Sequence, residues 1–247
     1  MKRSRDKIIK SASWEIRYNT SLLFFDRGGS VMQRLLESEG TEALPRWAYG
    51  TNGMELGNPE TFTRFILDAK RAAAVNENLR PVEDYNGSNH RALRFLRDAV
   101  GLLDISTVVR VGHRLIYLVP TDATFEQFAQ SLTRQLTLLD DFGSIEACQA
   151  EDVSAVWVSK HNGYSFRWAV GPLALREFRG RFMAHERPAN ATKDQRVFYP
   201  QVSLLVDVDA FRDGEAADSS ALDTFFAAAY AYMDEQATKL AHAIREE

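Results

Sequence analysis

Residues 108–120, VVRVGHRLIYLVP, constrain the fold more strongly than any other segment of the chain. Apolar residues recur at every second position, and this period of two predicts a β-strand in which alternate side chains share a face. One face would carry Val109 and His113 among apolar neighbours. The other face would carry Val108, Arg110 and Arg114. Such a strand requires a sheet with one buried face and one solvent-exposed face.

A second strand, 202–209 or VSLLVDVD, has the same division with the opposite charge, because Asp207 and Asp209 share one face. We expect both strands in one sheet, with arginines and aspartates pairing across its outer face. The alternative is a ligand cleft. Arg110 and Arg114 could bind a carboxylate or phosphate there, and the two aspartates could hold a divalent metal.

The first half contains further strand and helix patterns. Alternation predicts a strand over 14–25, and Ser30 with Gln33 after Gly28-Gly29 resembles a capping box that starts a helix. The glycine-rich segment 50–57 predicts a loop or tight hairpin. Asn58-Pro59-Glu60 predicts the start of a helix, whose apolar face would hold Phe62, Phe65, Ile66 and Ala69. A loop over 80–89 and a helix over 90–103 follow.

The second half is richer in strand patterns. Thr121 or Thr124 would start a helix after the 108–120 strand. The segments 153–160 and 164–170 flank Asn162-Gly163, which predicts a β-hairpin. A polar loop is expected over 184–196, and Ser219-Ser220 would cap a long last helix. That helix is apolar over a wide arc, so it needs two neighbours or a partner subunit, and we expect a homodimer that uses it. Its large apolar residues are Phe225, Phe226, Tyr230, Tyr232 and Met233.

These patterns together predict an α+β fold, with a mixed or antiparallel sheet covered by amphipathic helices. We expect a single globular domain over 1–247, and two similar packed halves, 11–140 and 150–247, are an alternative within it. Residues 1–10 would form a basic N-terminal arm. Its cationic residues are Lys2, Arg3, Arg5, Lys7 and Lys10.

Bulk composition excludes some classes of protein. The net charge of −4 argues against a polyanion binder that acts by overall charge, although the arm could still attract anions. The one cysteine, Cys148, fits a reducing compartment. No secretory signal or membrane span is recognisable, so we expect a cytoplasmic protein without membrane contacts.

The sequence carries no recognisable catalytic motif. The sequence has no phosphate-binding loop, no dinucleotide fingerprint and no nucleophile elbow, and no two of its five histidines lie three or four residues apart. We therefore assign no catalytic residue, no cofactor and no metal ligand. A histidine on an apolar strand face is more often a core residue than a catalyst. His113 nevertheless stays a candidate ligand-binding residue. The tryptophans alternate with apolar residues and are expected in the core: Trp14, Trp47, Trp157 and Trp168.

The order of these elements resembles a sporadically distributed, uncharacterised bacterial family of about 250-residue proteins. Its members have an R-x-G-x-R strand, which matches Arg110, Gly112 and Arg114 here, and a late L-D-x-D strand, which matches Asp207 and Asp209. His113 stands where the family has an apolar residue. The resemblance would cover nearly the whole chain, and it implies no activity.

Three functions stay open at this point. The first is a non-catalytic binding or regulatory accessory protein of a bacterial defence or mobile-element system, with a protein partner or a second copy as its ligand. We favour it because catalytic signatures are absent and apolar helix faces are abundant. The second is a metal-dependent phosphate-ester enzyme that uses Asp207 and Asp209. The third is a nucleic-acid binder that uses the basic arm with Arg110 and Arg114.

Overall fold

The structure is a computed structural model that describes residues 8–50, 52–77, 83–121, 123–129, 154–174, 176–177, 202–216 and 218–243. The long helices are α1 (Leu23–Glu39), α2 (Glu83–Leu102) and α5 (Ser219–Ala243). The first strands are β1 (Ile8–Tyr18), β2 (Arg46–Gly50), β3 (Gly53–Asn58), β4 (Thr63–Asp68) and β5 (Arg71–Asn76). The later ones are β6 (Thr107–Thr121), β7 (Ala155–His161), β8 (Tyr164–Ala174) and β9 (Val202–Ala216).

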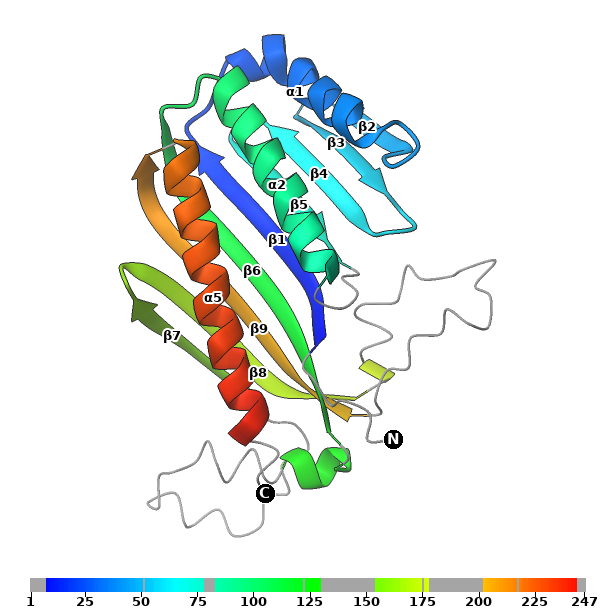
Figure 1. Ribbon diagram of the computed structural model, residues 1–247, viewed down its shortest axis with the longest axis vertical. Helices are drawn as coiled ribbons and strands as arrows, with labels where there is room; N and C mark the ends of the chain where they lie inside the picture. Colours follow the sequence, from blue (N-terminus) through cyan, green and yellow to red (C-terminus); the bar gives the residue numbers. More distant parts are fainter. Residues whose placement is uncertain are drawn as a thin grey trace.

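All nine strands form one antiparallel sheet in the order β2-β3-β4-β5-β1-β6-β9-β8-β7. Figure 1 shows the three helices on one face of this sheet, with α2 and α5 crossing its centre. The apolar core lies between the helices and that face. The predicted α+β class with a helix-covered sheet is therefore confirmed, and the sheet is antiparallel rather than mixed.

The described elements repeat their order about the central pair β1 and β6. In the first set, β1 pairs with β5, and α2 packs on both of these strands. In the second set, β6 pairs with β9, and α5 packs on both. By this repeat β6 belongs with the later elements, and the two sets share a single continuous sheet rather than separate sheets.

Several predicted elements are confirmed. The 108–120 strand is β6, the 202–209 strand lies in β9, and the helix over 90–103 lies within α2. The β7–β8 hairpin turns at Asn162 and Gly163, whose φ values of 50° and 81° are those that the Asn-Gly pair tolerates. The segment 50–57 contains the tight turn between β2 and β3.

The start of α1 was predicted wrongly. The first strand begins at Ile8 and ends at Tyr18, and α1 already begins at Leu23, so Gly28 and Ser30 are helical. A Cβ on Gly28 would lie 3.1 Å from the Phe24 ring and 3.3 Å from the Met54 side chain. This glycine marks a close approach between helix and sheet, not the end of an element.

The helix predicted at Asn58 does not form. Asn58 ends β3, and its Oδ1 accepts hydrogen bonds from the backbone N–H groups of Glu60 (2.8 Å) and Thr61 (3.2 Å). The same side-chain chemistry that caps a helix here closes a turn into β4. Residues 63–68 form a strand rather than a helix because β3 and β5 supply hydrogen-bonding partners on both sides of β4.

Smaller differences concern the ends of other helices. The predicted loop over 80–89 is partly wrong, because α2 begins at Glu83. Asp218, not Ser219 or Ser220, caps α5, since its Oδ1 accepts a hydrogen bond from the Ala221 N–H at 2.7 Å. Thr124 caps the short helical segment 125–129 as predicted. The loop expected over 184–196 and Cys148 lie outside the described residues.

The basic arm and the last helix also need correction. Lys10 was assigned to a solvated arm, but it lies in β1 and only 1% of it is exposed. Along α5, Tyr230 stacks on Tyr85 and Tyr232 stacks on His161, each with ring centroids 4.2 Å apart. The wide apolar arc of α5 is therefore covered within the chain, and the expected homodimer draws no support from this helix. In the described part of the chain, no helix has the length and apolar character needed to cross a membrane.

Candidate functional site

The predicted charged pairs form on the outer face of the sheet, which is the face opposite the helices. Arg114 donates through Nε and Nη2 to the two carboxylate oxygens of Asp207, at 2.7 and 2.5 Å. Arg110 donates through Nη2 to Asp209 at 3.1 Å and lies over the Phe211 ring at 4.1 Å. The structure thus brings together four of the five residues singled out in the sequence.

The pairing is diagonal across the β6–β9 ladder. Directly opposite one another in the register are Arg114 and Asp209, whereas Asp207 lies opposite Ile116. Long side chains reach diagonal neighbours in a twisted sheet. Arg114 therefore contacts Asp207, the same-face neighbour of its register partner Asp209. Arg110, whose register partner is Asp213, reaches further along β9 to Asp209. Alternation in the sequence cannot supply these details.

Partial burial shapes the electrostatics of this cluster. The Asp209 side chain is 31% exposed, and burial raises the pKa of its carboxyl group despite the opposing effects of Arg110 and Arg114. The hydrogen bond with Asp207 raises the pKa of Arg114, whose side chain is 52% exposed. These are half-exposed ion pairs, each of which stabilises the fold by about 0–1 kcal/mol.

Neighbouring arginines on the outer face also have carboxylate partners. Arg17 binds Glu15 at 2.6 Å, and Arg71 lies 3.3 Å from Asp68 and 3.9 Å from Glu15. An anionic ligand or a phosphate backbone would have to displace these carboxylates. Among the described residues no group of three or more His, Cys, Asp or Glu side chains is placed to share a metal ion.

The fifth candidate, His113, lies on the opposite face of β6 and is fully buried. Its Nδ1 lies 2.8 Å from the carbonyl oxygen of Ser13, so Nδ1 carries the proton and donates. Its Nε2 then accepts from the Tyr85 hydroxyl at 2.8 Å. Burial lowers the pKa of His113 from 6.5 to about 4, because a charged ring would lose its hydration there. His113 is therefore neutral at physiological pH.

Aromatic rings enclose this histidine. Trp14 stacks on His113 with centroids 5.3 Å apart, and Phe226 meets it edge-on at 5.6 Å. The Trp14 Nε1–H donates to Asn89 Oδ1 at 2.8 Å, which ties β1 to α2. The cluster joins both central strands to both covering helices, and it is packed as core. His113 is thus separated from the outer-face pairs by the sheet itself.

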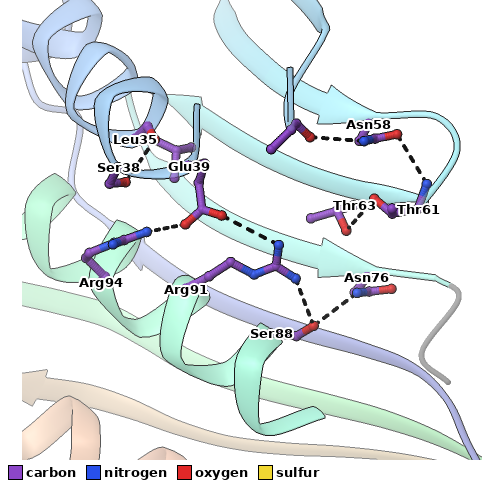
Figure 2. Close-up of polar contacts among 11 residues, drawn as sticks. Leu35, Ser38, Glu39, Asn58, Thr61, Thr63, Asn76, Ser88, Arg91 and Arg94 are labelled. Carbon is purple, nitrogen blue, oxygen red and sulfur yellow. Dashed lines mark hydrogen bonds and ion pairs between the residues drawn. The ribbon is translucent and has the colours of Figure 1, made fainter. Parts of the chain in front are cut away.

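A polar network between α1 and α2 was missed in the sequence. Glu39, whose side chain is 10% exposed, is held by Arg94 and by Arg91, with Arg91 Nη1 at 3.5 Å (Figure 2). Figure 2 also shows Ser88 Oγ accepting from Arg91 at 3.4 Å and from Asn76 at 3.1 Å. This network ties the end of α1 through α2 to β5.

A sequence signal for this network exists. Arg91, Arg94 and Arg97 recur every third residue and so share one side of α2. Arg97 extends the row by binding Asp223 of α5 at 2.5 Å. Beside Ser88 lies a cavity of about 10 Å³, with room for one water molecule. The row therefore links the helices to one another, and its chemistry is that of a structural clamp.

Among the described strands, most of the exposed large apolar side chains lie on the two edge strands, and Val109 of β6 is a further one. On β2, Trp47 and Tyr49 are each 72% exposed. On β7, Val156 is 57%, Val158 62% and Trp157 37% exposed. Trp14 and Trp168 are buried as predicted, but the prediction that Trp47 and Trp157 belong to the core is wrong. The sequence gives only a weak indication that Trp47 is exposed, because the alternation of residues in RWAYG is the same as in a half-buried strand.

Comparisons with known proteins add no identification. The chain matches no protein-family model and none of the curated proteins with which it was compared. The family resemblance expected from the two short motifs therefore stays a prediction.

Proposed function

We propose that the protein is a non-catalytic binding protein that takes an extended segment of a partner protein along the edge of β7 that pairs with no other described strand. The observation that carries this proposal is the exposure of three consecutive large apolar residues, Val156, Trp157 and Val158, on a strand at the edge of the sheet. An edge strand presents unpaired backbone N–H and C=O groups that an added strand can bind. Natural edge strands usually carry charges or prolines that prevent such pairing.

Aromatic and hydrogen-bond contacts hold the β7–β8 hairpin in place. Trp157 stacks on Trp168 with centroids 6.0 Å apart and planes 11° apart. Trp168 Nε1 donates to Ser159 Oγ at 3.1 Å, and the His161 ring lies against Tyr232 of α5. A preorganised edge loses little conformational entropy on binding, which favours association.

The chemistry of β7 also defines the partner segment. Val156, Val158 and Lys160 alternate and so share the outer face. An antiparallel partner strand would place an acidic residue opposite Lys160 and apolar residues opposite the two valines. Read from its N-terminus, the segment would be acidic-x-apolar-x-apolar. Main-chain hydrogen bonds would supply affinity, and these alternate side chains would supply specificity.

The other two functions receive less support. Asp207 and Asp209 have arginine partners, and this pairing competes with a metal ion. The outer face carries arginines and carboxylates side by side, which lowers its attraction for a nucleic-acid backbone. No observation bears on a role in a bacterial defence or mobile-element system, and that role stays a prediction.

The test is selection from a random-peptide display library on the immobilised full chain. Enriched peptides should alternate apolar residues, with an acidic residue two positions before the first. Their affinity should fall at least about tenfold for the double variant Val156→Lys/Val158→Lys. A matched control is Trp47→Lys on the opposite edge, which should bind them unchanged. Equal binding by the β7 variant, or no enrichment on the natural chain, would contradict the proposal.

A further inference from the structure

The opposite edge of the sheet raises a separate question. All five residues of β2 are exposed, and among the described strands β2 pairs with β3 alone. Trp47 lies opposite Leu56 and Tyr49 opposite Met54, so both rings are on the helix-covered face of the sheet. Yet most of the surface of each ring stays outside the fold. Packing within the chain therefore does not explain why two aromatic residues occupy this edge.

The sequence of β2, Arg-Trp-Ala-Tyr-Gly, is complementary to itself when two copies run antiparallel. We propose that β2 of one molecule pairs with β2 of a second copy about a two-fold axis at Ala48. Trp47 then lies opposite Tyr49 of the second copy, and Tyr49 lies opposite its Trp47. Aromatic pairs of this kind stabilise antiparallel strands. The two sheets become one continuous sheet with a closed, isologous interface.

Charge and shape agree with this register. Arg46 lies opposite Gly50 of the second copy, so no like charges face each other and the long side chain meets no opposing one. At β7 the corresponding axis at its central residue, Val158, would set Val156 opposite Lys160. Self-pairing about the centre of the strand is thus favoured at β2 and disfavoured at β7. The two edges are at opposite ends of the sheet, so this inference does not rest on the function proposed for β7.

The size of the contact predicts its strength. A buried aromatic side chain removes about 150–250 Å² from water, so four rings bury less than about 1,000 Å². Interfaces of this size are weak and transient. We expect a dissociation constant between about 1 μM and about 1 mM, so the dimer should form at high protein concentration.

Cysteine cross-linking tests the register directly. In a Cys148→Ser background, Ala48→Cys places a thiol on the proposed axis, where opposing Cα atoms would lie about 4.5–5.5 Å apart. That separation suits a disulfide. Under mild oxidation at about 100 μM protein, a concentration within the expected range of dissociation constants, the Ala48→Cys chain should form covalent dimers at least tenfold faster than the matched edge variant Val158→Cys. Equal rates, or faster cross-linking of Val158→Cys, would overturn the proposal.

Charge substitutions give an independent measurement by sedimentation equilibrium. Trp47→Lys/Tyr49→Lys sets like charges opposite each other and should weaken association more than tenfold. Trp47→Lys/Tyr49→Glu sets opposite charges face to face and should associate more tightly than the first variant. Both changes lie at exposed positions, so thermal melts should stay unchanged and show that the fold is intact. A natural chain that stays monomeric, or two variants that associate equally, would refute the interface.

Discussion

His113 and Arg114 are consecutive residues of β6, and their side chains lie on opposite faces of the sheet. His113 is fully buried, neutral, and hydrogen-bonded through both ring nitrogens. Arg114 is half exposed, charged, and bound to Asp207. A buried histidine without hydrogen-bonding partners would lower the free energy of unfolding by several kcal/mol. If Arg114 lost Asp207, water could hydrogen-bond to its guanidinium group instead, so the free energy of unfolding would change little. Similar polarity in the sequence therefore has very different energetic weight on the two faces.

The largest expected effect is at His113. His113→Ala removes a buried ring and leaves the Tyr85 hydroxyl and the Ser13 carbonyl without this partner. We expect the free energy of unfolding to fall by about 3–5 kcal/mol in urea titrations. Arg114→Ala is the matched control and should lose about 1 kcal/mol or less. Equal losses for the two variants would remove the contrast between the faces.

Acid should reveal the same contrast. The pKa of His113 is about 4 in the folded chain and near 6.5 when unfolded. Between these values the unfolded chain binds a proton that the folded chain does not, so stability falls as the pH falls through this window. The loss from this group is about 3 kcal/mol between pH 6.5 and pH 4.

The control for the acid effect is His113→Gln, which keeps hydrogen-bonding capacity but does not titrate. Unfolding titrations at several pH values should give a shallower decline for this variant, because the contribution of His113 is then absent. A decline of the same slope in both proteins would show that His113 does not stay neutral when folded.

A smaller effect should separate two adjacent valines. The β1–β6 register shifts between Arg17 and Tyr18, which pair with Arg110 and Val108, so Val109 is bulged out. The prediction that Val109 faces the core and Val108 the charged side is therefore wrong, since Val108 is 0% and Val109 49% exposed. Val108→Ala should lower the unfolding free energy by about 2 kcal/mol, and Val109→Ala by less than about 0.5 kcal/mol. Thermal melts of both variants would sharpen or remove this distinction.

The smallest expected effect lies in the ion pairs themselves. A double-mutant cycle with Arg114→Ala and Asp207→Ala should give a coupling free energy of about 0.5–1 kcal/mol, reduced by added salt. The Arg110 and Asp209 cycle should give a value of similar size. A coupling free energy of zero would contradict a direct ion pair between the two side chains. A large loss that phosphate reverses would instead favour the anion-binding alternative.

Much of the fold was predictable because its signals are local. The strand β6, the Asn162-Gly163 hairpin and the helix face of α2 follow from side-chain period and from allowed φ values. The helix predicted at Asn58 is wrong because an Asn side chain satisfies backbone donors in a turn as well as at a helix start. The helix start predicted at Ser30 is wrong because Gly28 and Gly29 do not interrupt α1. After Asn58 the chain forms a turn and a strand rather than a helix because β4 pairs with β3 on one side and β5 on the other. A short stretch of sequence around Asn58 does not show that both partners are present.

The sequence by itself determined which residues of β6 and β9 share a face over most of their length, because alternation is a property of the extended backbone. It also determined that arginines and aspartates of opposite strands could meet. Only the tertiary structure decided that Arg114 reaches Asp207 diagonally, that a bulge reverses Val108 and Val109, and that Trp47 lies at an uncovered edge. These outcomes depend on register, twist and the position of α1 and α2 over the sheet. Contacts between distant segments set those features, and no pattern within a single segment records them.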